Sequence, residues 1–141
     1  MLFRSVLATG SSDRIGQGQS NTVVSDGQQK SESKIDLADH AAAIDLHLQE
    51  LLKLKAISAI SDVQAIGYKA VHGGPISGAV IVDDSVLDTM QQFADVAPQH
   101  NPPYIAAMKA FAKKLPGVPQ VAAFETALDR KSTRLNSSHR L

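Results

Sequence analysis

The sequence predicts an α/β fold, and three observations support this prediction. Short segments rich in β-branched residues alternate with longer segments whose apolar residues recur at helical spacing. Proline and glycine clusters separate these segments. The length of 141 residues suits one domain, or a piece of a larger one. Helices that alternate with short buried strands are typical of α/β domains.

Residues 6–34 form a mostly polar segment, in which short apolar pieces lie between turn residues. This pattern predicts weak edge strands or a hairpin. A disordered linker is equally consistent with the composition, because few apolar side chains are present to offset the entropy lost on ordering. The sequence leaves both interpretations open for this segment.

Residues 36–56 give the clearest helix prediction in the chain. Asp36 is the predicted N-cap, and Asp39 lies in the first turn, where a carboxylate suits the positive end of the helix. His40 and His47 lie off the apolar stripe, and we interpret them as solvated or packing residues rather than ligands. The stripe at helical spacing consists of Leu37, Ala41, Ile44, Leu48, Leu51 and Leu52.

The second half of the chain predicts strands and helices in alternation. Asp83 and Asp84 cap the first of these helices, and Asn101, as a capping side chain before two prolines, marks the start of the second. Pro116 and Gly117 end that second helix. The predicted elements are strands at 65–71 and 79–82, helices at 85–96 and 101–115, and a buried strand at 120–124.

The sequence of the two chain ends indicates that neither end belongs to the native protein. The codons GAT CGG AAG AGC AC can encode the start of the tail, DRKST, preceded by the final A of a leucine codon. The reverse complement, GTG CTC TTC CGA TCT, encodes residues 1–5, MLFRS, when GTG is the start codon. The tail also resembles a translated short-read sequencing adapter. We therefore predict that residues 1–5 and 129–141 are adapter-derived, and we exclude them from the fold.

Excluding these ends changes the charge of the chain. It removes five of the 14 basic and one of the 14 acidic residues, and the remaining 9 and 13 give residues 6–128 a net charge of −4. The chain then lacks the excess of basic residues that is usual in nucleic-acid-binding proteins, and we predict no nucleic-acid partner.

No run approaches the roughly 18 apolar residues of a membrane span. The chain has no cysteine for a disulfide or thiolate site, and we predict a cytoplasmic protein without membrane association.

Three groups of polar residues lie where α/β proteins usually hold their chemistry, beyond strand ends or at helix starts. Each group alone has an ordinary structural explanation, as an exposed strand residue, a turn or a helix cap. A metal site built from the two histidines and the glutamate is an alternative that their spacing does not support, so we predict no metal ligand. The groups are Lys69 with His72-Gly73-Gly74, His100 with Asn101, and Glu125 with Thr126.

These groups fall within three motifs whose order and spacing resemble those of one family. The motifs are AIGYKAVHGG, VAPQHNPP and VPQVAAFETA, and they span residues 65–127, about half of the chain. Over this span the chain resembles the acetate kinase family, within the broader acetate and propionate kinase group. Three motifs at matching separations are far more specific than a lone glycine pair.

The resemblance implies both a fold and an activity. The fold is an actin-like, sugar-kinase-like (ribonuclease H-like) domain with helices flanking a mixed β-sheet, and residues 6–128 would form part of the N-terminal one. The activity is reversible transfer of the ATP γ-phosphoryl group to the carboxylate of acetate with Mg²⁺, in a homodimeric enzyme. Such a reaction depends on positioning and charge neutralisation more than on covalent chemistry. The family's first-strand phosphate loop and nucleotide-binding half have no counterpart in residues 6–128, so we predict that this chain alone is inactive.

The resemblance also implies roles for individual residues. Glu125 stands where the family has an essential aspartate, and His100 where it has a phosphoryl-contacting histidine, and these two are the predicted catalytic residues. Lys69 stands where the family has an arginine that binds the substrate carboxylate or phosphoryl group. The predicted substrate-binding residues are Lys69, Val71, His72, Gly73, Gly74, Gln99 and Asn101.

Three departures from the family pattern leave the substrate open. Lys69 is a point charge that cannot hold a carboxylate with two parallel hydrogen bonds, as an arginine does. Glu125 is longer than an aspartate by a methylene, and Gln99 stands where the family has an apolar residue facing the acyl methyl group. Propionate or butyrate is therefore an alternative substrate. A non-catalytic α/β binding module is an alternative of a different class.

Overall fold

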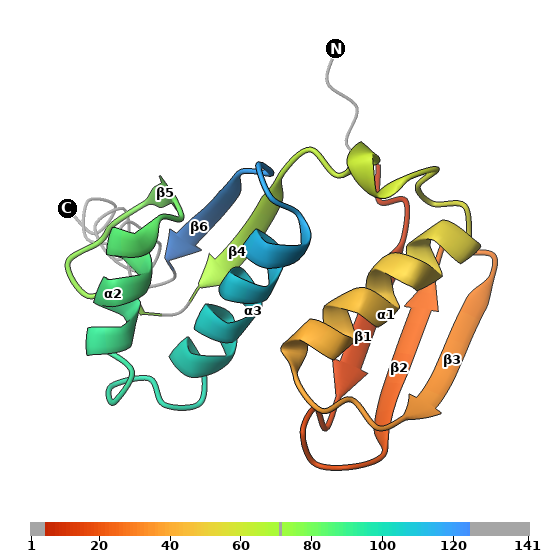
Figure 1. Cartoon of the computed structure of the whole chain (residues 1–141), viewed down its shortest axis with the longest axis horizontal. Helices are drawn as coiled ribbons and strands as arrows, with labels where there is room; N and C mark the ends of the chain where they lie inside the picture. Colours follow the sequence, from red (N-terminus) through yellow and green to blue (C-terminus); the bar gives the residue numbers. More distant parts are fainter. Residues whose placement is uncertain (1–4, 71, 125–141) are drawn as a thin grey trace, which may run out of the picture. The chain divides into compact units, whose positions relative to one another are not determined.

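The computed structural model describes residues 5–70 and 72–124. The chain divides into two compact units, Met1–Val63 (unit 1) and Gln64–Leu141 (unit 2), and each is described by itself (Figure 1). Each unit combines a β-sheet with helices, which confirms the predicted α/β class. The described strands form two three-stranded sheets, one in each unit, rather than one continuous sheet.

Unit 1 contains an antiparallel sheet in the order β1-β2-β3, so the polar segment forms strands rather than a linker. The turn between β2 and β3 is held by Asp26, whose carboxylate accepts hydrogen bonds from the backbone N–H groups of Gln29 (2.6 Å) and Gln28 (2.9 Å). These bonds keep the pKa of Asp26 below its usual value. The strands are β1 (Thr9–Asp13), β2 (Ser20–Ser25) and β3 (Lys30–Ile35).

Helix α1 (His40–Lys53) packs on β2, and the sheet positions beneath it are small and mostly polar. Ser12 Oγ lies 2.7 Å from Thr22 Oγ1 and 2.8 Å from His47 Nε2. The imidazole of His47 lies against Gly10, where a Cβ atom would come within 2.7 Å of Nδ1. Burial lowers the pKa of His47, while the nearby Glu50 carboxylate acts in the opposite direction. His47 is therefore a packing residue, as its position off the apolar stripe indicates.

The start of α1 differs from the sequence prediction. Asp39, not Asp36, is the N-cap, and its carboxylate accepts a hydrogen bond from Ala42 N (2.9 Å). The reason lies in Leu37, which is buried and whose backbone is bonded outside the helix. Leu37 N donates to Ser20 Oγ (3.3 Å), and Leu37 O accepts from Gly16 N (2.7 Å). These bonds hold residues 36–38 in a non-helical conformation, and the helix begins only after them.

Unit 2 contains a mixed sheet in the order β4-β6-β5. Strand β4 runs parallel to β6, with Ala70 opposite Phe124, and β5 is antiparallel to β6. The carboxyl ends of β4 and β6 therefore lie at the same edge of the sheet. The strands are β4 (Ile66–Ala70), β5 (Ala79–Ile81) and β6 (Gln120–Phe124), each within the range expected from the sequence.

Helices α2 (Asp84–Gln92) and α3 (Asn101–Lys114) cover one face of β4 and β6 (Figure 1). Asp83 caps α2 by accepting a hydrogen bond from Val86 N (2.9 Å). The helix ends at Gln92, four residues earlier than predicted, because the chain turns there with a bond from Ala94 N to Gln91 O (3.1 Å). The buried core between helices and sheet consists of Ala70, Val86, Met90, Ile105, Met108, Ala122 and Phe124.

None of the helices in the described part of the chain is long and apolar enough to cross a lipid bilayer.

Candidate functional site

The predicted site begins in the loop that follows β4. Because β4 and β6 are parallel and in register, the two strands end at the same edge of the sheet, at Ala70 and at Phe124. In open α/β sheets, ligands usually bind outside the carboxyl ends of the strands. The backbone thus brings the His72-Gly73-Gly74 loop to the edge of the sheet at which β6 ends with Phe124.

His72 is held in one orientation by two contacts. Its Nδ1 atom accepts a hydrogen bond from Gly74 N (3.1 Å), and its ring stacks on Phe93, with centroids 5.3 Å apart and planes inclined by 21°. A backbone N–H can only donate, so Nδ1 must be the acceptor. In the neutral imidazole the proton then resides on Nε2. The loop therefore presents an Nε2–H donor from a half-buried ring.

The two glycines have structural reasons of their own. A Cβ atom on Gly73 would lie 2.6 Å from Cδ1 of Phe124, and one on Gly74 would clash with the ring of Phe93. Gly74 also has a positive φ of 59°, which disfavours any side chain. These contacts explain the glycines without a ligand, so the predicted substrate-binding role of both stays a prediction. No local pattern in the sequence indicates that Phe93 and Phe124 pack on this loop.

The second motif, VAPQHNPP, lies beside the His72 loop. Asn101 is fully buried, and its Nδ2 atom donates hydrogen bonds to His72 O (2.9 Å) and Met90 O (3.0 Å). His100 and Gln99, the two residues before it, are exposed. The structure therefore brings the turn that carries His100 next to the His72 loop, although 29 residues separate His72 from Asn101.

The sequence predicted a capping role for the Asn101 side chain, and that prediction is wrong. Asn101 is the first residue of α3, His100 occupies the N-cap position, and no side chain caps the helix. Pro102 lies at the start of the helix, where a missing amide hydrogen is harmless, as expected. The Asn101 side chain is instead turned inward and bonded to backbone carbonyl groups.

Lys69 lies in β4 opposite Ala123 and is exposed. Side chains alternate across a strand, so Lys69 projects from the sheet face opposite to that of Tyr68 and Ala70, which pack towards the helices. Val71 and Glu125 lie outside the described residues, and their predicted roles stay predictions.

Tyr68 has a strongly shifted pKa, but its contacts show a structural role. Burial raises the pKa of its phenol well above the usual range. The hydroxyl donates a hydrogen bond to Gln120 Oε1 (2.6 Å), and the ring meets Tyr104 and Phe111 edge-on. Tyr68 therefore ties β4 to β6 and α3 within the core.

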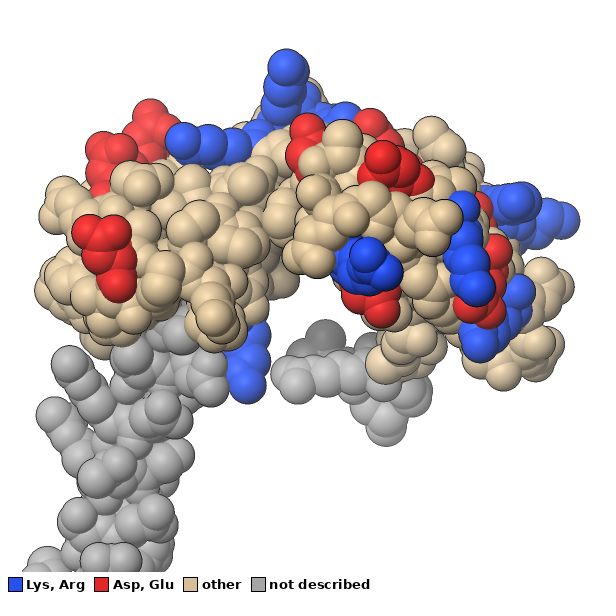
Figure 2. All heavy atoms as spheres, turned by 90° about the horizontal axis from the view of Figure 1, so that it is seen from below, with Lys and Arg blue, Asp and Glu red and all other residues tan. Residues whose placement is uncertain are grey.

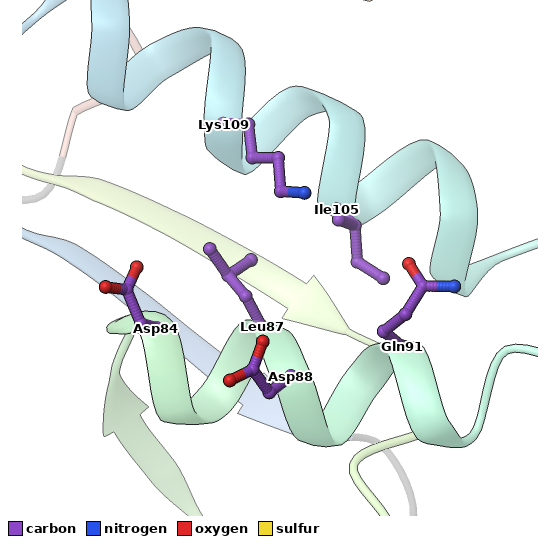
Figure 3. Close-up of a pocket in the computed structure, with 6 residues that line it drawn as sticks. All are labelled: Asp84, Leu87, Asp88, Gln91, Ile105 and Lys109. Atoms are coloured by element: carbon purple, nitrogen blue, oxygen red, sulfur yellow. The ribbon is translucent and has the colours of Figure 1, made fainter.

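A groove of about 340 Å³ lies between α2 and α3 (Figure 3). Lys109 of α3 and the carboxylates of Asp84 and Asp88 of α2 border it, but none of the predicted site residues within the described ranges does. On the face shown in Figure 2, acidic and basic side chains are intermingled over the described residues. The complete lining is Asp84, Leu87, Asp88, Gln91, Ile105 and Lys109.

The described geometry is that of an α/β protein whose polar loops meet at one edge of a parallel strand pair. The family model described as the acetokinase family matches residues 3–136. The acetate kinase of Thermosipho africanus is 40% identical over 129 residues, which cover 89% of this chain and 32% of that protein. The acetate kinase of Bacillus subtilis is 36% identical over 128 residues, which cover 90% and 32%.

Solved structures agree with this relationship. Acetate kinase of Porphyromonas gingivalis matches with a TM-score of 0.82 and 30% identity, over 87% of this chain and 32% of that one. A propionate kinase of Francisella tularensis matches with a TM-score of 0.75 and 26% identity, over 86% and 31%. The chain belongs to the acetokinase family.

The chain spans about a third of the length of the curated relatives it matches. The family match runs into the tail for which the sequence predicts an adapter origin. That origin, for residues 1–5 and 129–141, stays a prediction, as does the assignment of residues 6–128 to an N-terminal domain.

Proposed function

We propose that residues 6–128 form part of a cytoplasmic, homodimeric phosphotransferase that moves the ATP γ-phosphoryl group to the carboxylate of acetate, reversibly. The observation that carries this proposal is the hydrogen bond from Asn101 Nδ2 to His72 O (2.9 Å). It joins two motifs that are far apart in sequence and that both resemble the active-site motifs of the family. The membership of the chain in the acetokinase family supports the same conclusion.

The residues of this chain would act by positioning and charge. The Nε2–H group of His72 and the exposed ring of His100 would donate hydrogen bonds to anionic oxygens of the substrate or the phosphoryl group. Lys69 would add a positive charge near the carboxylate. Fixed donors and cations of this kind stabilise the charge that spreads over a transferring phosphoryl group. Glu125 would hold its charge in line with the attacking oxygen.

The described residues do not by themselves form a magnesium site. No group of three or more His, Cys, Asp or Glu side chains among residues 5–70 and 72–124 is arranged to hold a metal ion. The predicted carboxylate, Glu125, lies outside these ranges. We therefore assign no step of the reaction to the metal or to the nucleotide, which the proposal takes from the family.

The test is a chimera in which residues 6–128 replace the equivalent third of the Thermosipho africanus acetate kinase. We expect acetyl phosphate formation, measured as the hydroxamate with acetate, ATP and Mg²⁺. The parent enzyme is the positive control, and the isolated 141-residue chain, which we expect to show no turnover, is the negative one. A chimera that is folded but inactive would contradict the proposal and favour a non-catalytic binding module.

The same assay compares acids of increasing length. The similarity to a propionate kinase structure and the polar Gln99 in place of an apolar residue favour propionate or butyrate as a second candidate. If kcat/KM for propionate or butyrate exceeds the value for acetate, that acid replaces acetate as the proposed substrate. The transferred group and the phosphoryl donor would stay the same.

A further inference from the structure

Asn101 joins three separate segments of unit 2 from a fully buried position. Its side chain is 0% exposed, and Nδ2 donates both of its hydrogens, one to His72 O (2.9 Å) and one to Met90 O (3.0 Å). His72 belongs to the loop after β4, Met90 to the last turn of α2, and Asn101 itself begins α3. One amide group therefore fixes the loop relative to both helices.

The bond to Met90 satisfies a carbonyl that the helix leaves open. The last four carbonyl groups of an α-helix have no partner within it. In α2, Thr89 O accepts from Phe93 N (3.3 Å) and Gln91 O from Ala94 N (3.1 Å). The carbonyl between these two, that of Met90, is bonded by Asn101. The end of α2 is thus fixed next to Phe93, whose ring stacks on His72.

The remaining atom of the amide indicates that stability alone does not explain this residue. Asn101 Oδ1 is buried and has no hydrogen-bond partner in the described part of the chain. A buried acceptor without a partner costs about 1–3 kcal/mol. That cost offsets much of what two bonds to neutral carbonyls contribute, at about 0.5–1.5 kcal/mol each. Asparagine at this position therefore contributes geometry more than stability.

We propose that Asn101 is a positioning residue, which holds the His72 loop against the turn that carries His100. The amide fixes the backbone of His72, and Phe93 and Gly74 then fix its ring with Nε2–H as the presented donor. Asn101 is too deeply buried to reach a substrate, so its effect on phosphoryl transfer is indirect. The catalytic part of this inference rests on the proposed function, whereas the orientation of His72 does not.

Gln120 provides a matched control in the same unit. Its buried side-chain amide also donates to a helix carbonyl, from Nε2 to Met108 O (3.1 Å), and accepts from Tyr68. It contacts neither the His72 loop nor the turn before α3 through any of these bonds. If Asn101 were merely structural, Asn101→Ala and Gln120→Ala would behave alike.

The first test uses the full 141-residue chain and nuclear magnetic resonance of its histidine rings. We expect the ¹⁵N shifts of His72 to report the Nε2–H tautomer in the wild type, and a mixture of tautomers in Asn101→Ala. Gln120→Ala should keep the wild-type signature. Asn101→Ser, which retains one donor, should lie between the two and covers the case that the alanine variant does not fold. An unchanged His72 signal in both Asn101 variants would overturn the proposal.

The second test measures kinetics in the active chimera at a temperature where all variants are folded. We expect Asn101→Ala to lower kcat on the order of tenfold to a hundredfold, with the KM for ATP unchanged, since small displacements of catalytic groups cost this much. Gln120→Ala should stay within about twofold. An equal kcat for both would refute the positioning role. An inactive wild-type chimera would refute the proposed function instead, while the ring measurement would still decide the orientation of His72.

Discussion

Unit 1 buries small polar side chains as well as aliphatic ones between helix and sheet, whereas the same space in unit 2 holds mainly aliphatic side chains, methionine and phenylalanine. Beneath α1 the buried positions include Ser20 and Thr22, and His47 completes a hydrogen-bonded chain through Ser12. Beneath α2 and α3 the largest buried side chain is Phe124. Side-chain hydrogen bonds thus add to the apolar contacts between helix and sheet in unit 1, whereas apolar contacts predominate in unit 2.

The polar groups of the two units also have different partners. In unit 1 the bonded side chains of Ser12, Thr22 and His47 satisfy one another inside the unit. In unit 2 the buried amide of Asn101 bonds to the backbone of a loop that resembles an active-site loop. A polar side chain that fixes a loop on an apolar core is what a preorganised site requires. This difference supports the proposal that the chemistry belongs to unit 2, and the following predictions test that proposal.

The largest effect is expected at Glu125, in the active chimera. Glu125→Gln removes the charge and keeps the shape, and we expect kcat to fall more than about a hundredfold because a charge in line with the attacking oxygen is lost. Glu32→Gln, at an exposed position of unit 1, should leave kcat within about twofold. A similar small change at Glu125 would remove this residue from the mechanism.

Glu125→Asp distinguishes a site that requires glutamate from one that only tolerates it. In a site built around glutamate, the shorter side chain should lower kcat, because the carboxylate no longer reaches its place. In a site that only tolerates glutamate, restoring the aspartate typical of the family should raise kcat. The hydroxamate assay of the chimera distinguishes the two outcomes.

The next largest effect is on stability and compares the two cores directly. Phe124→Ala in unit 2 should cost about 3–5 kcal/mol of unfolding free energy, as typical for a buried phenylalanine. Val24→Ala in unit 1 should cost about 2 kcal/mol, from roughly 0.8 kcal/mol per buried carbon plus a cavity term. Hydrogen exchange of peptides from each unit measures both. A larger loss for Val24→Ala would reverse the ranking of the two cores.

The same contrast explains what the sequence could predict. The apolar, β-branched strands of unit 2 and the starts of its helices were all predicted within a few residues, because burial, the Asp83 cap and the prolines at the start of α3 are local signals. In unit 1 the strands are mostly polar, with few apolar residues, and the sequence could not distinguish them from a linker. The early start expected for α1 was wrong because Ser20 and Gly16 bind the backbone of Leu37, and such partners are not visible in a local pattern.

The candidate site was predicted less completely than the fold. Its loop and turn followed from three motifs and their resemblance to a family. The inward turn of Asn101 and the packing of Phe93 and Phe124 on the glycines depend on tertiary contacts between distant segments. An asparagine before two prolines has the same sequence pattern whether its side chain caps the helix or turns into the core. Only the structure could distinguish these two conformations of Asn101.

The glycine loop gives the next prediction. Gly73→Ala should cost about 1–3 kcal/mol, because the new methyl group overlaps Phe124. Gly74→Ala should cost more, since overlap with Phe93 adds to a positive φ. Gly78→Ala is the control, with a φ of 75° but nothing within 4 Å, and should cost only roughly 1–2 kcal/mol. Equal losses at Gly74 and Gly78 in urea unfolding would show that the aromatic rings do not constrain the loop.

The smallest effect is a pH dependence that belongs to unit 1. Burial lowers the pKa of His47 in the folded chain, so the unfolded chain, with the ordinary value of 6.5, binds the proton more readily. The stability that depends on neutral His47 is therefore fully present above pH 6.5. It falls as the pH drops below this value, until His47 in the folded protein also binds a proton. Of the groups around the ring, Ser12, Thr22 and Gly10 are uncharged, and only Glu50 favours the charged imidazole.

His47→Gln tests this dependence, because a glutamine amide can still bond to Ser12 but does not titrate. We expect the protection of unit 1 peptides against hydrogen exchange, corrected for the intrinsic rate, to decrease from about pH 7.5 to about pH 5.5 in the wild type and to change less in the variant. The difference should be smaller than any substitution effect above, since the ring is only half-buried and Glu50 opposes the shift. If both proteins lose the same protection on acidification, the pH dependence comes from other groups, and the buried polar chain of unit 1 is insensitive to the charge of His47.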